Sequence, residues 1–206
     1  MKKVEHLRQL LTYFEIPDLS ALNLSMNNVH YKGMFSLVIQ GSEFGKLKRV
    51  FIAGEELREH EVQFHTHRYP ITLTVLKGTV RHHTATPTQD TDQSVVSLSI
   101  WDYLSPLNGG VGLTYHGEGG FKLDDYSLPE TSTIYIEPHE YHTMSVSKGA
   151  IWVVEEYGFE TEGSKVLGVP FILDDLYTKP KSFQTYGMFQ RVKKQLKSLI
   201  NNFDLI

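Results

Sequence analysis

Cysteine is absent from this sequence, and its absence removes several kinds of chemistry at once. Disulfides, thiolate metal ligands and a cysteine nucleophile are all excluded. The lack of cysteine also fits a reducing compartment, so we expect a cytoplasmic protein. Long hydrophobic runs are missing too: no stretch approaches about eighteen apolar residues, and we expect no membrane span. The first residues, MKKVEHLRQLLTYFEIPDL, mix charges into their apolar positions and lack a small-residue cleavage site, which is atypical of a signal peptide.

An excess of positive charge is also missing. The formal net charge is −4, whereas proteins that bind nucleic acid usually carry a basic face. We therefore expect a small-molecule substrate or ligand as the partner and no nucleic acid. The remaining balance, 40% hydrophobic and 21% charged residues over 206 positions, is that of an ordinary globular chain. Residues 1–206 are long enough for one domain with a sizeable core.

Helical spacing of apolar residues occurs only near the two ends of the chain. At the N-terminus it involves Val4, Leu7, Leu10, Leu11 and Phe14, and Pro17 ends the pattern, which predicts a helix over 1–17. At the C-terminus it involves Phe189, Val192, Leu196, Leu199 and Phe203, which predicts a helix over 183–203. The basic residues of that second segment fit a solvated helix face.

Between about residues 34 and 170 the apolar pattern changes to a period of two. The candidate strands are short and rich in β-branched and aromatic residues: MFSLVIQ, KRVFIA, EVQFHTH, ITLTVL, TVRHHT, SVVSLSIW, STIYIEP, HTMSV and AIWVVEE. Many short strands without intervening helices predict a mainly β sandwich or barrel. Two stretches interrupt the pattern. We expect residues 84–93 to form a polar loop, and the glycine-rich residues 107–130 to form a long hairpin or a loop over the barrel mouth.

The segment FHTHRYPITLTVLKG raises the central question of function. Side chains alternate along a strand, so His65 and His67 are expected on one face, with Ile71 and Leu73 following them toward the barrel interior. Two strand histidines at this spacing can reach one metal ion, and imidazole suits Zn, Cu, Fe or Ni. Taken alone, such a pair is more often two histidines that hydrogen-bond to their neighbours.

A second segment, IYIEPHEYHTMSV, changes that balance. It predicts a strand, a proline-containing turn and another strand, and it places His142 at the start of the later strand. One pair and one distant histidine are what a three-ligand site built from two parts of a sheet requires. We therefore predict a metal site formed by His65, His67 and His142.

These two segments resemble the motifs of the cupin superfamily, whose members are double-stranded β-helix (jelly-roll) barrels. The His-x-His pair and a following glycine of the first motif are matched by His65, His67 and Gly78. The proline turn and histidine of the second motif are matched by Pro138 and His142. The resemblance covers about residues 34 to 158. It implies a single-domain cupin barrel over 34–170 with flanking helices.

The chain departs from the usual cupin pattern at the fourth ligand. The glutamate of the family would fall at Ile71 or Thr72, and neither side chain can replace it. A site of three histidines resembles the cupins that include thiol dioxygenases and dioxygenases that cleave carbon–carbon bonds. The resemblance thus implies Fe(II) as the cofactor, with Zn, Ni or Mn as alternatives, and an O₂-dependent reaction on a thiol acid, diketone or hydroxy acid. The same departures also fit a member without metal.

Further residues are candidates for roles around the metal. The resemblance to thiol dioxygenases suggests Tyr157 as a catalytic residue, although a packed tyrosine is the simpler interpretation. Arg49 and Arg81 are candidate clamps for a substrate anion, with ordinary surface arginines as the alternative. One residue of the His82–His83 pair is a candidate to face the interior, with a solvated pair as the alternative, and we assign His83 to substrate binding.

Other classes of function stay open at this point, because fold does not determine function. They are a non-enzymatic small-molecule-binding barrel, a metal-dependent isomerase or lyase that never uses O₂, and a scaffold protein. Barrels of this type have exposed sheet edges that pairing between subunits would cover, so we expect a homodimer.

Overall fold

Strands dominate the computed structural model, which describes residues 2–15, 23–29, 32–58, 63–90, 94–104, 109–168 and 181–182 and the single positions 190, 193, 194 and 197. The helix is α1 (Lys2–Glu15), and the longer strands are β2 (Lys32–Gln40), β3 (Lys48–Arg58), β4 (Ile71–Lys77), β5 (Val80–Thr88), β6 (Val95–Leu104) and β7 (Gly112–Leu128). The shorter strands are β1 (Met26–Asn27), β8 (Thr133–Ile136), β9 (Tyr141–Val146), β10 (Ile151–Glu156), β11 (Ser164–Leu167) and β12 (Lys181–Ser182). The predicted mainly β architecture is confirmed.

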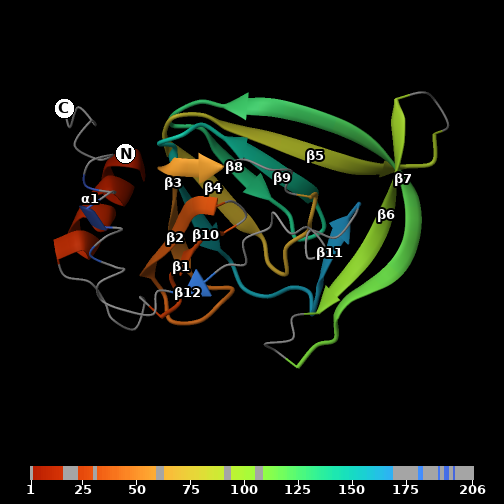
Figure 1. The fold of residues 1–206 in the computed structure, drawn as a ribbon, viewed down its shortest axis with the longest axis horizontal. Coiled ribbons are helices and arrows are strands. Elements are labelled where there is room, and N and C mark those ends of the chain that lie inside the picture. The colour runs from red at the N-terminus through yellow and green to blue at the C-terminus, as the bar shows by residue number, and fades with distance from the viewer. Residues whose placement is uncertain are drawn as a thin grey trace.

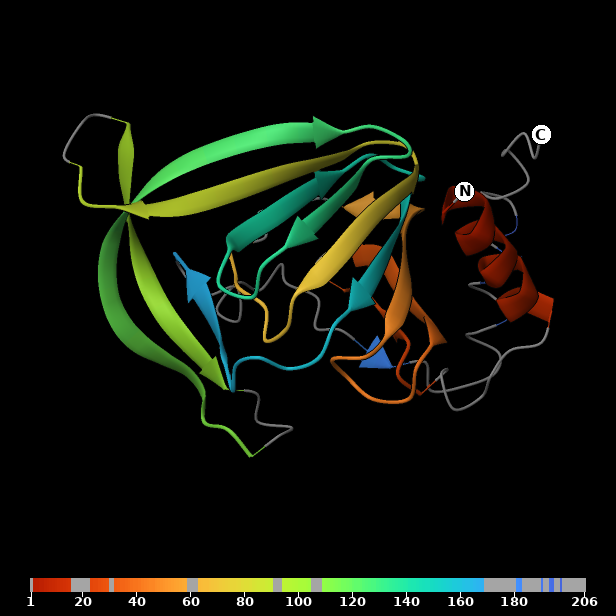
Figure 2. The ribbon, with the colours of Figure 1, turned by 180° about the vertical axis from the view of Figure 1, so that it is seen from behind.

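The strands form two sheets in which every paired strand is antiparallel. The larger has the order β12-β1-β2-β3-β10-β4-β8, and the smaller has the order β11-β6-β7-β5-β9 (Figure 1). The α1 helix lies at one end of the molecule beside the larger sheet, and the β6–β7 hairpin extends at the other end, as both views show (Figures 1 and 2).

The segment 64–66 joins the two edge strands of the smaller sheet. His65 pairs with His142 on β9 and with Val166 on β11 as isolated bridges. Its backbone N–H donates to the carbonyl of His142 at 3.0 Å, and the N–H of Leu167 donates to the carbonyl of Phe64 at 2.9 Å. These bonds satisfy backbone groups that an open edge would leave unpaired. The result is a nearly closed antiparallel β-barrel, with the histidine segment at the seam.

Two of the three buried hydrophobic clusters lie on opposite sides of the larger sheet, and the third, with Ala85, Phe121, Tyr141 and Leu167, belongs to the smaller sheet. Along β10, Ile151 and Val153 pack into the outer cluster that α1 covers, while Trp152 and Val154 pack into the inner cluster. Both faces of this central strand are therefore covered, which explains why IWVV is apolar without alternation. As expected from the parity of the FHTHRYPITLTVL segment, the inner cluster also contains residues 71, 73 and 75.

One predicted boundary differs from the structure, and two predicted segments extend beyond the described residues. The N-terminal helix is described over Lys2–Glu15, and positions 1, 16 and 17 of its predicted range lie outside the described residues. Its buried Leu7, Leu10 and Tyr13 belong to the outer cluster. The expected polar loop begins later, because β5 continues to Thr88 along β7. Of the expected C-terminal helix over 183–203, most residues lie outside the described part of the chain, and the described positions 190, 193, 194 and 197 are helical.

The glycine-rich stretch forms the long hairpin rather than a covering loop. Strand β7 pairs with β6 on one side and with β5 on the other. A register shift lies between Ile100 and Trp101, opposite Gly117, whose φ of 145° few other residues adopt. None of the helical segments in the described residues has the length and apolar character needed to cross a bilayer.

Candidate metal site

The predicted strand over EVQFHTH is wrong in its described part, since residues 63–67 form no regular strand and only the bridges of His65. Residues 61 and 62 of that segment lie outside the described residues. The backbone of 64–66 is bonded to β9 and β11, and beyond it the N–H of His67 donates to the carbonyl of Pro138 at 3.1 Å. The chain then bends at Arg68 and Tyr69 into β4. This short, doubly bonded segment still places His65 and His67 at one cluster.

The third histidine comes from the second residue of β9. His142 is buried, and its backbone exchanges two hydrogen bonds of 3.0 Å with His65. One ligand atom from each of His65, His67 and His142 lies within 4.8 Å of the others. The Nε2 atoms of His67 and His142 are 2.6 Å apart. The structure thus brings together the three histidines named from the sequence, and they can hold a metal ion.

Ring orientations test whether these residues fit an ion. The Nδ1 of His65 lies 3.1 Å from the carbonyl oxygen of Gln63, which can only accept, so the neutral ring carries its proton there and its lone pair on Nε2. Burial also lowers the pKa of His65, which favours that neutral ring. Imidazole ligands bind at about 2.0–2.1 Å, and their nitrogens then lie about 3 Å apart. Small ring movements meet this requirement, so the cluster fits a divalent ion.

The ring of His82 is hydrogen-bonded to the ring of His142. It is fully buried on β5, and its Nε2 lies 3.1 Å from Nδ1 of His142 while its Nδ1 lies 3.0 Å from the hydroxyl of Tyr126. Burial lowers the pKa of His82 to about 4, so the ring is neutral at pH 7. When Nε2 of His142 binds an ion, Nδ1 keeps its proton and donates to His82. Partners of this kind fix the tautomer and orientation of a ligand.

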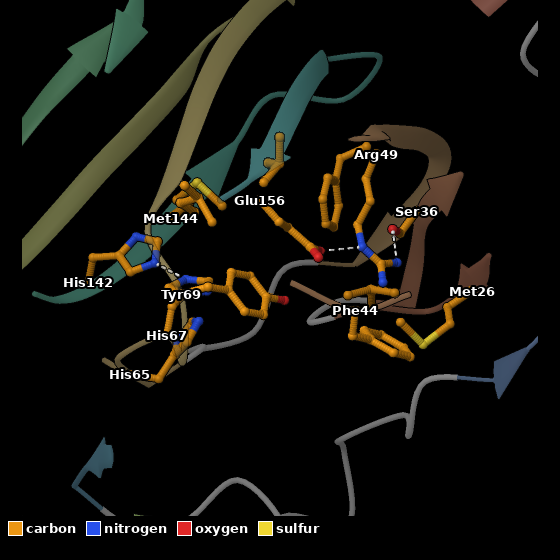
Figure 3. A pocket seen from close by; sticks show the side chains of 14 residues that line it. Met26, Ser36, Phe44, Arg49, His65, His67, Tyr69, His142, Met144 and Glu156 are labelled. Atoms are coloured by element: carbon orange, nitrogen blue, oxygen red, sulfur yellow. Dashed lines mark hydrogen bonds and ion pairs between the residues drawn. The ribbon is translucent and has the colours of Figure 1, made fainter. Parts of the chain in front are cut away.

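The histidines line one end of a cavity of about 160 Å³ between the sheets (Figure 3). It is lined by apolar side chains from the inner faces of four strands: Phe51, Ile71, Met144 and Val154. Arg49, Glu156 and Ser36 lie at the end away from the histidines, and Tyr69 lies between the two ends (Figure 3). Cavities of this type suit a small ligand with few polar contacts.

The polar end of the cavity is a buried ion pair. Arg49 is 4% exposed and Glu156 is 7% exposed, and Nε of Arg49 donates to Oε1 of Glu156 at 2.8 Å. The other carboxylate oxygen accepts from the backbone N–H of Gly45 at 2.6 Å and of Leu47 at 3.3 Å. Burial and the Glu156 charge raise the pKa of Tyr69, which therefore stays protonated. This end holds one positive and one negative charge that offset each other.

The remaining sequence candidates lie in different places. Arg49 lines the cavity, whereas Arg81 is exposed and pairs with Asp125 at 2.6 Å. His83 hydrogen-bonds to Oγ of Ser145 at 2.7 Å and does not line the cavity, because neighbouring residues on β5 face opposite sides and His82 takes the inner one. Tyr157 is 51% exposed, and its hydroxyl donates to Glu155 at 3.3 Å rather than pointing into the cavity.

Sequence reasoning missed three polar residues of this region. Tyr69 and Glu156 received no role, and His82 was set aside in favour of His83. Strand parity contained a signal for His82, because it pairs with Met144, which lies two residues from His142 on the same face of β9. That signal becomes usable only once the register between β5 and β9 is known.

Comparisons with known proteins add little to this geometry. No model of a known family matches the chain, and no curated protein matches its sequence. A protein of unknown function from Vibrio parahaemolyticus matches 60% of this chain and 86% of its own, with 16% identity and a TM-score of 0.21. A Shewanella oneidensis protein matches 83% of this chain and 90% of its own, with 14% identity and a TM-score of 0.26. Similarity this low supports no conclusion, so the function must be argued from the site.

Proposed function

We propose that this protein is a cupin-type jelly-roll enzyme that holds one Fe(II) ion on His65, His67 and His142 and oxidises a small chelating substrate with O₂. The substrate class is a thiol acid, diketone or hydroxy acid. The observation that carries the proposal is the convergence of three imidazoles within 4.8 Å at the end of a small, mostly apolar cavity. A dioxygenase places both oxygen atoms in its product, so no external reductant is required.

The chemistry of the bound group would be that of a Lewis acid and a template, since three neutral imidazoles leave the ion its full charge and open positions for two reactants. The chain supplies orientation. Gln63 and His82 hold the rings of His65 and His142, and both rings keep a proton on Nδ1. The apolar walls formed by Phe51, Ile71 and Val154 exclude water around the reacting atoms.

Elemental analysis tests the proposal first. The protein is purified without chelator and without a histidine-rich tag, beside His65→Ala, His142→Ala and the control His83→Ala, whose histidine lies outside the cavity. We expect about one equivalent of iron in the parent protein and in the control, and loss of iron in the two site variants. O₂ uptake with thiol acids and diketones then follows. An unchanged metal content in folded His65→Ala and His142→Ala would refute the site.

The same ligands favour a second candidate, because three neutral imidazoles also accept Zn, Ni or Mn. A metal-dependent isomerase or lyase would be fully active with Zn(II) or Mn(II) in the absence of O₂. A bound ligand without turnover would instead indicate a binding barrel. The homodimer and the cytoplasmic location stay predictions, and light scattering of the purified protein tests the first of them.

A further inference from the structure

At the end of the cavity opposite the histidines, one nitrogen of Arg49 has no hydrogen-bond partner among the described residues. The guanidinium of Arg49 donates from Nε to Glu156, and from Nη1 to the carbonyl of Leu24 and the hydroxyl of Ser36, both at 3.2 Å. These are its hydrogen bonds within the described part of the chain. The third nitrogen, Nη2, therefore keeps its two N–H groups for a ligand in the cavity that Arg49 lines.

The charge beside this donor is already balanced. Glu156 accepts hydrogen bonds at both carboxylate oxygens, from Arg49 on one side and from two backbone N–H groups on the other. A ligand carboxylate at Nη2 would gain the attraction of Arg49 but would lie in the same buried region as the Glu156 carboxylate. The ligand carboxylate would also lose its hydration. That loss is costly for a buried charge, and Arg49, its counter-charge, is already paired with Glu156. A neutral carbonyl oxygen avoids both penalties and still accepts a charge-assisted bond.

The groups between the two ends supply no further charge for an acidic ligand. Phe51, Ile71 and Val154 are apolar, and the phenol of Tyr69 is neutral. Phe44 also lines the cavity, and the central carbon of the Arg49 guanidinium lies over its ring, 5.0 Å from the centroid. The polar contacts for a ligand are thus concentrated at the two ends of the cavity.

We propose that the substrate has a short apolar body that ends in a neutral carbonyl oxygen, as in an amide, ester or ketone, and that Arg49 Nη2 binds this oxygen. Any acidic group of the substrate would lie at the histidine end. This inference rests on the proposed function, because the other end of the substrate is the metal-chelating one. It also replaces the idea of Arg49 as a clamp for a carboxylate with a contact to a neutral group.

Three probes separate the two ends of the cavity. The first two, 4,6-dioxoheptanamide and 4,6-dioxoheptanoate, share a diketone head and a short chain and differ in the neutral or charged group at the tail. The third, 2,4-pentanedione, has the head alone. Each is titrated calorimetrically, without O₂, into protein loaded with Fe(II). We expect the amide to bind at least about tenfold more tightly than the carboxylate, because only the carboxylate is repelled by the Glu156 charge and loses the hydration of an ion.

Two variants test which residue binds the amide or carboxylate end of the probe. Arg49→Met should reduce binding of the amide to the level of 2,4-pentanedione. Glu156→Gln removes the negative charge beside Nη2 and should reverse the preference toward the carboxylate. Circular dichroism and thermal unfolding establish that each variant is folded, and the comparison of amide with carboxylate in the parent protein requires no variant.

The outcomes distinguish the two proposals. Binding of 2,4-pentanedione with equal or tighter binding of the carboxylate would overturn the inference about the tail and leave the metal site intact. Failure of all three probes to bind the loaded protein, or failure of the protein to load, would overturn both. Retention of the amide preference in folded Glu156→Gln would refute the argument from charge.

Discussion

Replacing one partner of the Arg49–Glu156 ion pair should destabilise the protein more than any other single substitution at the candidate site. Both side chains are buried, and their bonded atoms lie 2.8 Å apart. Arg49→Met would leave the Glu156 carboxylate buried without a counter-charge. Removing one partner of a buried pair costs about 3–5 kcal/mol. Since 1 kcal/mol corresponds to roughly 2–4 °C for a chain of this size, the melting temperature should fall by roughly 10 °C.

Urea unfolding followed by circular dichroism measures this effect in a double-mutant cycle. Arg49→Met and Glu156→Leu are measured singly and together, and the double variant should lose less than the sum of the two, because the second change removes the charge that the first left unpaired. The exposed pair of Arg81 and Asp125 provides the control, and Arg81→Met should cost less than about 1 kcal/mol. Equal, small losses for Arg49→Met and Arg81→Met would refute the reasoning that burial makes the first pair important.

Three further predictions concern other parts of the molecule. His82→Phe should weaken metal binding by about 10–100-fold with the ligands intact, because it removes the acceptor for Nδ1 of His142; competition with a metal-sensitive dye measures it. Burial lowers the pKa of His6 below its ordinary 6.5, so the unfolded chain takes up a proton before the folded one and stability should fall as the pH drops below about 6.5. Since the pKa values of His65 and His82 are lowered too, His6→Asn should reduce the pH dependence of the urea-unfolding free energy between about pH 7.5 and 5.5 without abolishing it, and an unchanged slope would contradict the assignment. Gly78→Ala should cost about 1–2 kcal/mol, since φ is 75° and a Cβ would meet Oγ of Ser147 at 2.8 Å, whereas Gly109→Ala, with φ of 77° and open space, should cost less.

The sheet architecture was predictable because burial leaves a period-two signal in each strand. The strands β2, β4, β9 and β10 begin and end within two residues of their expected bounds. The histidine segment was the exception. Its spacing indicated a strand, but its backbone forms hydrogen bonds to two different strands over only three residues. His65 and His67 therefore reach the same cluster although the segment is not part of a regular strand ladder. Local pattern thus predicted that the three histidines come together, while it assigned the wrong element to His65 and His67.

The choice between His82 and His83 shows a different limit of sequence reasoning. The two residues have the same side chain and adjacent positions, so composition and local pattern do not distinguish them. The choice depends on the pairing of Thr84 with His142, because that register places His82 beside the ring of His142. Strand register is a tertiary property, and a shift of one residue would have exchanged the roles of the two histidines.

The distribution of charge in the cavity differs from the one that the cupin resemblance implies, in which a glutamate is the fourth metal ligand. The resemblance would place that glutamate at Ile71 or Thr72, and Ile71 is 2% exposed and lines the cavity. The carboxylate of the cavity is Glu156 instead, and it is bound by Arg49 at the opposite end. An ion on the three histidines would therefore keep its full positive charge and favour an anionic chelating group. The far end has no net charge and favours a neutral one, so the two ends of the cavity should select opposite ends of a single asymmetric substrate.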